Sequence, residues 1–237
     1  MRTFRWTATA ALVAVASLGF VPSSMAQYQR PQHTPGAFFE STKQACETAI
    51  DNRLSRISTL QQLVNGSQHV TADHRSTLLS QLSSAQSGLS ALKTKIEGDT
   101  DATTLHADCR SIVDDYRIYV LVSPKVREVL VSDLETDVAA RLTTIAARIQ
   151  TAIDNAKAKG KDTTTAQDDL DQMKTAIASA RSAIDGVASN VIDLTPSDWP
   201  GAHDTLVNGR QSLRTGRNDL HTARNDGWDA VQSLRQS

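Results

Sequence analysis

Basic side chains recur at helical spacing close to the C-terminus of the chain. They are Arg210, Arg214, Arg217, His221 and Arg224, separated by alternating steps of four and three residues. Side chains at such steps share one face of a helix, so the pattern predicts a continuous basic ridge. Guanidinium groups bind phosphate and carboxylate groups strongly. The ridge is therefore a candidate binding face for an anionic wall polymer, an acidic lipid headgroup or an acidic partner protein.

The same arginines have a structural alternative. They flank an apolar stripe, so their stems can cover apolar edges while the guanidinium groups pair with acidic side chains of neighbouring helices. Asp219, Asp226 and Asp229 lie nearby in the sequence and weaken the positive field, which favours this alternative. The stripe also contains Gly209, Gly216 and Gly227. These glycines indicate either a close approach between helices or a loosely packed last helix.

The other polar residues form no recognisable catalytic or metal-binding pattern. The six histidines are His33, His69, His74, His106, His203 and His221, and no two of them are three or four residues apart. Adjacent carboxylates occur at Asp114 and Asp115 and again at Asp168, Asp169 and Asp171. Such runs are typical of solvated helix faces and first turns. There is no Gly-x-Ser-x-Gly motif and no glycine-rich phosphate loop after a strand. We expect no catalytic residues, no metal site and no cofactor.

The N-terminus has the pattern of a secretory signal peptide. Two arginines precede an apolar block at 8–21, and small residues follow at the positions that signal peptidase reads. We expect a signal peptide over 1–26, cleaved between Ala26 and Gln27, and a polar, flexible leader over 27–38. An uncleaved anchor is the alternative, but the block is shorter than the roughly 20 residues that a membrane span needs. No second apolar run of spanning length follows, so we expect no transmembrane span in the mature chain.

Composition favours an all-α exported protein. Cleavage after residue 26 leaves 211 of the 237 residues, with 23 Lys and Arg against 26 Asp and Glu, a formal charge of −3. This charge gives no case for nucleic-acid binding. Aromatic and β-branched residues are too scarce for a sandwich or barrel, and the abundance of Ala, Leu, Gln, Ser, Asp and Arg favours helices.

Apolar residues recur at steps of three and four along almost the whole mature chain. The expected helices span about 39–64, 71–98, 101–122 and 124–159, and two more carry apolar stripes from 166 to 191 and from 206 to 234. We predict an antiparallel bundle of two tandem three-helix, coiled-coil-like units, at 39–123 and 124–237. The halves share faint similarities, and whether they arose by duplication stays open.

The segment IYVLV, residues 118–122, precedes Ser123 and Pro124, which are typical of a helix N-cap and first helical position. We therefore expect IYVLV to be the buried end of the third helix, with Tyr116 and Tyr119 closing the end of the bundle. A short strand is the competing interpretation, because β-branched residues are dense here.

Cys46 and Cys109 are the two cysteines of the chain. In an exported protein such a pair predicts a disulfide. In an up-down-up bundle the first and third helices are parallel, and each cysteine lies about two turns into its helix on the apolar stripe. The spacing therefore places the two sulfurs at the same level of one core, as a disulfide requires.

Three segments, KQACETAIDNRL, SALKTKIEGDTDATTLHADCRSI and DYRIYVLVSPKV, together resemble a group of uncharacterised secreted helical proteins of high-GC Gram-positive bacteria. The resemblance covers about residues 41–131 and the general character of the second half. It implies export and a helical, coiled-coil-like body, and it transfers no catalytic residue.

The function we expect is that of an exported, non-catalytic structural or interaction protein of the cell envelope or the extracellular medium. Its partner would be another envelope protein or an anionic wall or lipid surface. The alternative is a lipid- or wall-polymer-surface binder whose amphipathic helices open to expose their apolar faces. A secreted hydrolase is a third candidate.

Overall fold

The computed structural model describes residues 35–236, and the expected signal peptide and most of the expected leader lie outside the described residues. The described chain is an all-α antiparallel bundle. Its longer helices are α1 (Pro35–Gly66), α2 (Ala72–Gly98), α3 (Ala102–Asp114), α4 (Ser123–Lys157), α5 (Thr164–Ile184) and α7 (Gly201–Gln236). Three short elements connect them: a π-helical turn η1 (Ile118–Val122), α6 (Val187–Ile192) and a 3-10 turn η2 (Pro196–Asp198).

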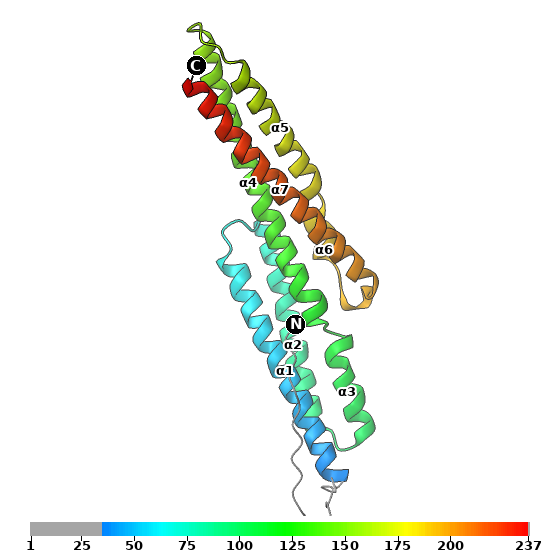
Figure 1. Cartoon of the computed structure of the whole chain (residues 1–237). Helices are drawn as coiled ribbons and strands as arrows, with labels where there is room; N and C mark the ends of the chain where they lie inside the picture. The colour runs from blue at the N-terminus through cyan, green and yellow to red at the C-terminus, as the bar shows by residue number, and fades with distance from the viewer. Residues whose placement is uncertain (1–34, 237) are drawn as a thin grey trace, which may run out of the picture.

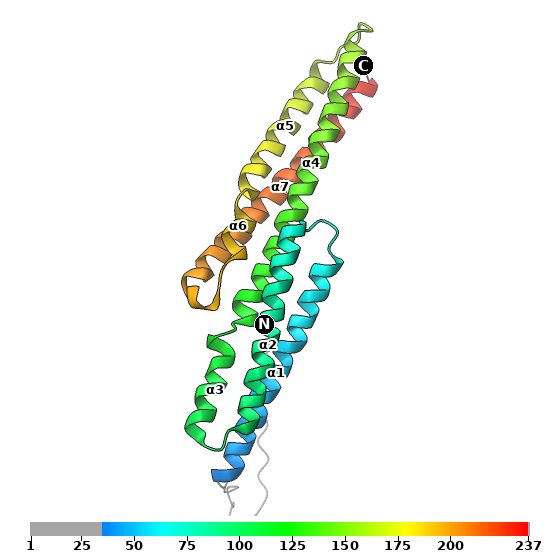
Figure 2. The same cartoon turned by 180° about the vertical axis from the view of Figure 1, so that it is seen from behind.

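The helices form an elongated rod (Figure 1). Helices α1, α2 and α3 occupy one end, and α5 with the C-terminal part of α7 occupies the other. Helix α4 starts beside the first group and continues into the second, and α7 runs beside it in the same direction, as the reverse view also shows (Figure 2). Because α4 and α7 are parallel, residues at equal spacings on the two helices can face each other in register.

Two apolar clusters fill the rod. The first combines α1, α2 and α3 with the start of α4, with α6 and with the start of α7. The second combines the rest of α4 with α5 and α7. Helix α4 contributes Val126, Val129 and Leu130 to the first cluster. Its buried contribution to the second begins at Ala139, and Val131 and Val138 pack against the second cluster while partly buried. The two clusters therefore divide within α4, beyond Pro124, and α4 is common to both.

Local sequence signals account for most helix ends. The Thr71 side chain accepts a hydrogen bond from the His74 amide at 3.2 Å, and Asp101 caps α3 by accepting from the amides of Thr103 and Thr104. Gly66 and Gly98 are the last residues of α1 and α2, and neither adopts a left-handed conformation. Helix α1 begins at Pro35, four residues before the expected start at 39.

The expectation for the IYVLV segment is wrong. Helix α3 ends at Asp114, and Arg117 adopts a left-handed conformation with φ 42°. The segment then forms the π-helical turn η1, which runs directly into α4. Tyr119 is 49% exposed, so it does not close the bundle, whereas Tyr116 is half-buried against the first cluster. The strand alternative fails as well, because residues 118–122 are helical.

Contacts from distant residues hold this break in place. The Arg117 Nε donates to the Pro196 carbonyl at 3.2 Å, and its guanidinium lies 5.3 Å from the centre of the Trp199 ring. A second break interrupts the stripe expected to continue to Val191. Gly186 has φ 73° and separates α5 from α6. Left-handed backbone is readily adopted by glycine, so the chain can turn here without strain.

The predicted disulfide is confirmed. Cys46 and Cys109 are bonded, with their Cα atoms 5.6 Å apart, and they link α1 to α3 across 63 residues of sequence. Both cysteines pack against the first apolar cluster. A disulfide of this kind indicates an oxidising, extracytoplasmic location.

Candidate anion-binding groove

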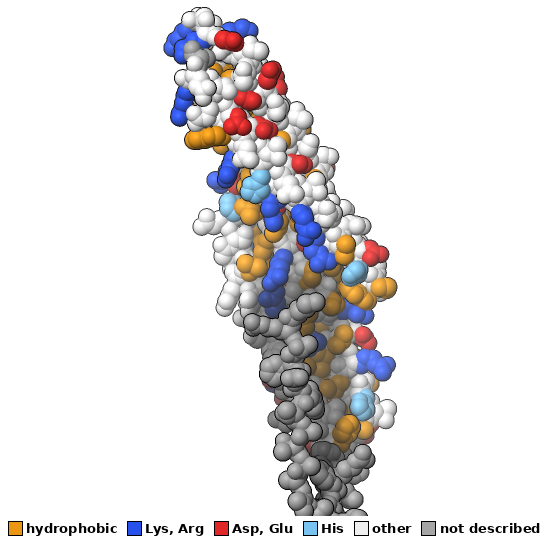
Figure 3. Space-filling model, in the orientation of Figure 1, with side chains coloured by type: hydrophobic (Ala, Val, Ile, Leu, Met, Phe, Trp, Pro, Cys, Tyr) orange, Lys and Arg blue, Asp and Glu red, His pale blue; other side chains and the backbone are white. Residues whose placement is uncertain are grey.

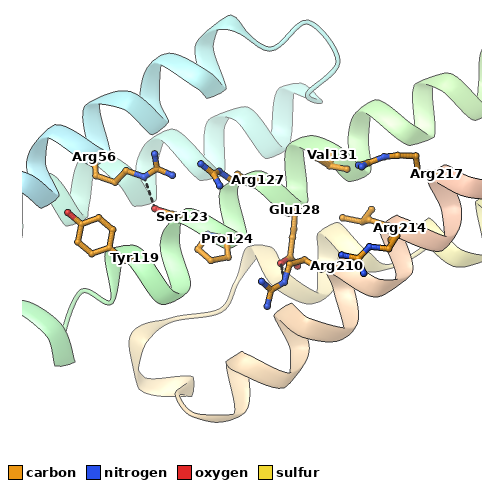
Figure 4. Close-up of a pocket in the computed structure, with 11 residues that line it drawn as sticks. Arg56, Tyr119, Ser123, Pro124, Arg127, Glu128, Val131, Arg210, Arg214 and Arg217 are labelled. Carbon is orange, nitrogen blue, oxygen red and sulfur yellow. Dashed lines mark hydrogen bonds and ion pairs between the residues drawn. The ribbon is translucent and has the colours of Figure 1, made fainter. Parts of the chain in front are cut away.

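A cavity of about 570 Å³ lies where α1 and η1 meet α4 and α7 (Figure 4). Its lining residues are Arg56, Tyr119, Ser123, Pro124, Arg127, Glu128, Val131, Arg210, Leu213, Arg214 and Arg217. We call this cavity the arginine groove, because guanidinium groups converge on it from α1, α4 and α7. Figure 3 shows Lys and Arg side chains gathered over α4 and α7 in the middle of the molecule.

The basic ridge of α7 is divided between different surroundings. Arg210, Arg214 and Arg217 line the arginine groove. Arg224 lines a separate cavity beside Trp228, farther along α7. His221 is exposed on the same helix and lines neither cavity. The structure therefore brings three of the five ridge residues together.

Two groove arginines were not among the predicted site residues. Arg56 lies in the middle of α1, and Arg127 lies in the first turns of α4, close to Pro124. Neither is adjacent to the ridge in sequence, and only the packing of the four elements places them beside it. No local pattern could have identified Arg56.

The acidic residues that pair with the groove arginines could have been predicted from their spacing in the sequence. Glu128 and Glu135 are seven residues apart on α4, and Arg210 and Arg217 are seven residues apart on α7. Because the two helices are parallel, the equal spacing aligns two acid–arginine pairs in register. Arg210 Nε lies 3.6 Å from Glu128 Oε1, and Arg217 Nη2 lies 3.0 Å from Glu135 Oε1.

The Glu128 carboxyl is buried, and few contacts offset the cost of burying its charge. Its side chain is only 4% exposed. Neither carboxylate oxygen has a hydrogen-bond partner among the described residues. Burial raises the pKa of the Glu128 carboxyl to about 7, and the nearby Arg210 guanidinium opposes the rise. Gly209 makes room for this carboxyl, since a Cβ at that position would lie 2.6 Å from Glu128 Oε2.

Glu135 is better paired. Its Oε1 accepts from Arg217 Nε at 3.0 Å, while its Oε2 has no hydrogen-bond partner within residues 35–236. Burial raises the pKa of the Glu135 carboxyl, and the hydrogen bond and charge of Arg217 oppose that rise. This pair agrees with the structural alternative for the ridge, in which its arginines pair with acidic side chains of a neighbouring helix, and the longer Arg210–Glu128 contact follows the same pattern.

The remaining guanidinium groups differ in how firmly they are held. Arg56 Nε donates to the Ser123 hydroxyl at 3.0 Å. Arg127 and Arg214 are exposed, and neither forms a hydrogen bond or ion pair with a described residue. Five guanidinium groups and the Glu128 carboxyl line the groove, and Glu135 pairs with Arg217 from outside it, so the groove is a positively charged cavity with two exposed, unpaired arginines among its described lining residues.

A buried lysine fixes the start of α4 near the groove. Lys125 donates to Gln81 Oε1 at 2.6 Å and to the Leu194 carbonyl at 2.8 Å. Gln81 in turn donates to the Ile192 carbonyl at 3.0 Å. Burial lowers the pKa of Lys125 to about 8. These bonds tie α2, α4 and the segment after α6 together.

The other candidate residues lie elsewhere. His69 and His74 each approach an α4 carboxyl at 2.9 Å, those of Asp137 and Asp133 respectively. Asp168 and Asp171 line a shallow cavity between α5 and α7, and Asp114 lies 3.7 Å from Arg117.

In the part of the chain that the structure describes, no three His, Cys, Asp or Glu side chains are grouped as metal ligands. None of its helices has the length and apolar character to cross a bilayer.

Comparisons with protein-family models, with curated proteins and with solved structures found no match to this chain.

Proposed function

We propose that this protein is an exported, non-catalytic helical protein of the cell envelope or the extracellular medium, and that it binds an anionic partner in the arginine groove. Export is supported by the signal-peptide pattern of residues 1–26 and by the disulfide, which is typical of oxidising compartments. Anion binding is supported by the excess of guanidinium groups over carboxyl groups in the groove.

The observation that carries the proposal is the state of Arg127 and Arg214. An arginine that serves ion pairing has an acidic partner, as Arg217 has Glu135. These two line the cavity without a partner of their own. Guanidinium groups with free donors on a concave surface bind anions through charge-assisted hydrogen bonds. A non-catalytic role fits the same site, since Ser123 accepts from Arg56 and the nearest carboxyls are buried beside arginines.

The position of the groove in the rod also supports a role in binding a partner. In a two-unit organisation, 39–123 and 124–237, Arg56, Tyr119 and Ser123 belong to the first unit and the other lining residues to the second. The first unit is held by the disulfide, and α4 joins it to the second. An anionic partner in the groove would therefore contact both units at their junction.

The test is binding of a model polyanion, dextran sulfate, to the Arg127→Gln/Arg214→Gln double variant at physiological salt. Each lost charge-assisted bond is worth about 1.5–3 kcal/mol, so we expect the affinity to fall at least about tenfold. The matched control is Arg110→Gln/Arg148→Gln, which removes the same charge from exposed arginines outside the groove. Equal losses in the two variants would show that the binding is a net-charge effect and would refute the groove.

Binding to a lipid surface is a second candidate, favoured by one observation. Trp228 is 62% exposed and Ile145 is 44% exposed, and with Arg224 they line a cavity on α4 and α7. Tryptophan beside a cation is typical of residues at a membrane interface. Co-sedimentation with anionic liposomes, with the disulfide intact and reduced, tests this candidate. Absence of binding in both states would reject it.

A further inference from the structure

We propose that the arginine groove binds a phosphate group and that Glu128 is protonated in this complex, donating a hydrogen bond to a phosphate oxygen. The proposal deepens the function proposed above and rests on it. It depends on a second observation, independent of the arginines: an almost fully buried carboxyl group that lines the cavity and has no hydrogen bond on either oxygen.

A buried carboxyl without partners is costly to a fold, so its position requires a reason. Arg210 does not supply one, because its Nε lies 3.6 Å from Glu128 and donates to the Leu206 carbonyl at 3.2 Å. Figure 4 shows the Glu128 side chain extending from α4 toward Arg210 on α7. Both carboxyl oxygens are buried, whereas the Arg210 side chain is 55% exposed, so a ligand that displaces the Arg210 side chain would reach the unsatisfied carboxyl.

The groups around Glu128 are cationic or apolar. Across the groove lie Arg210 and Arg214 of α7, and Arg56 approaches from α1. On α4, Arg127 is adjacent to Glu128 in the sequence. On α7, Arg217 lies one heptad after Arg210 and is paired with Glu135. From α6, Val187 packs against Gly209 beside the carboxyl, and α6 carries no titratable residue. The acids nearest on the packed elements are Glu135, which is paired with Arg217, and Asp185, which lines a separate cavity with Val187 and Gly209. Neither charge contributes to the pKa of Glu128.

With Glu128 protonated, the groove presents a hydrogen-bond donor from the acid together with those of the guanidinium groups. Phosphate oxygens are strong acceptors that several donors can share. A ligand carboxylate has only two oxygens and meets fewer of these donors. The cavity of about 570 Å³ is far larger than one phosphate group, so it has room for a phosphate that belongs to a larger molecule.

Binding should therefore be linked to proton uptake. The pKa of Glu128 is already about 7 in the free protein because the group is buried. Above that pH the carboxylate must take up a proton before the anion binds, so affinity falls as pH rises. If only the protonated form binds, the affinity should be about tenfold lower at pH 8 than at pH 6.

The test uses isothermal titration of sulfate into the full mature protein at pH 6 and pH 8. Sulfate has the tetrahedral oxygens of phosphate, but its charge is constant over this range, whereas a phosphate monoester titrates near pH 6. We expect about a tenfold loss of affinity at pH 8 for the wild type. Glu128→Gln keeps a donor and does not titrate, so its affinity should change less than about twofold between the two pH values.

Glu135→Gln is the matched control, because it removes an equally buried acid of the same helix and should retain the pH step. The proposal is overturned if the wild type binds equally at both pH values, or if Glu128→Gln keeps the tenfold step. If the wild type shows no pH step but its polyanion binding still depends on Arg127 and Arg214, this inference is rejected and the proposed function stands.

Further titrations at pH 6 identify the ligand class and its source. Glycerophosphate should bind more tightly than acetate, and equal affinities would overturn the phosphate assignment. Vesicles of phosphatidylglycerol, compared with phosphatidylcholine, test a lipid headgroup as the source. Binding of glycerophosphate alone supports a soluble ester or polymer, binding of the anionic vesicles supports the headgroup, and binding of neither refutes the proposal.

Discussion

The Glu128 carboxyl illustrates how one buried group can set a pH dependence of stability. Its pKa is about 7 in the folded protein and near 4.5 when the chain is unfolded. The folded state therefore binds more protons than the unfolded state between these values, and stability falls as pH rises from about 4.5 to 7. Above pH 7 the folded protein carries a poorly compensated buried charge.

Replacing this carboxyl with an uncharged amide should stabilise the protein at high pH. We expect Glu128→Gln to raise the free energy of unfolding at pH 8 by up to about 3 kcal/mol. Near pH 4.5 the wild-type group is already neutral in the folded state, so the difference should be small. Urea denaturation of both proteins at the two pH values measures this. A Glu128→Gln variant that is less stable than the wild type at pH 8 would contradict the assigned burial penalty.

At the scale of elements, the glycines of α7 allow close contact with its neighbours. A Cβ at Gly216 would lie 2.6 Å from Ile184 Cγ1 and 3.4 Å from the Ala180 carbonyl oxygen. The close approach, and not loose packing, is therefore the role of this seam glycine. Its neighbours belong to α5, so the contact fixes the spacing of the second cluster.

Gly216→Ala should consequently destabilise the protein, although alanine is the better helix former by about 1 kcal/mol. Overpacking typically costs about 1–3 kcal/mol, so we expect a net loss on the order of 1 kcal/mol and a lower Tm. Gly98→Ala is the control, because a Cβ there meets nothing within 4 Å. Thermal denaturation followed by circular dichroism compares the two. A Tm for Gly216→Ala at or above that of the wild type would show that the contact relaxes freely.

The elements also show which features a single sequence can predict. Apolar periodicity predicted the helices, and equal depth in parallel helices predicted the Cys46–Cys109 bond. The break at Arg117 could not be predicted, because distant residues such as Trp199 stabilise it. The break at Gly186 was missed because an apolar stripe continues across it.

Only part of the candidate site could be predicted, because local spacing identifies residues on one helix but not contacts between distant helices. Arg210, Arg214 and Arg217 follow from helical spacing on one element. Pairing of Glu128 and Glu135 with the ridge could have been inferred from the matching heptad spacing, once α4 and α7 are taken as parallel. The contribution of α1 depends on how the two apolar clusters meet, and local periodicity contains no information about that contact.

At the scale of the whole molecule, the disulfide stabilises one end of the rod more than the other. It closes a span of 63 residues within α1–α3 and, on the chain-entropy model, stabilises that end by about 4 kcal/mol. The second cluster has no covalent link in the described chain. Helix α4 passes through both clusters, and Lys125 ties it to α2, so opening of the far end leaves the first turns of α4 anchored.

We therefore expect amide hydrogen exchange in the oxidised protein to be fastest, among buried helical positions, in α5 and in the C-terminal halves of α4 and α7, since local opening there breaks only noncovalent contacts. Reduction, or the Cys46→Ser/Cys109→Ser variant, should accelerate exchange in α1 and α3 by a larger factor than in α5. Mass spectrometry of peptides from each helix measures both factors. Equal acceleration in all helices would show that the rod unfolds as one cooperative unit, and faster exchange of α1 than of α5 in the oxidised protein would reverse the proposed order.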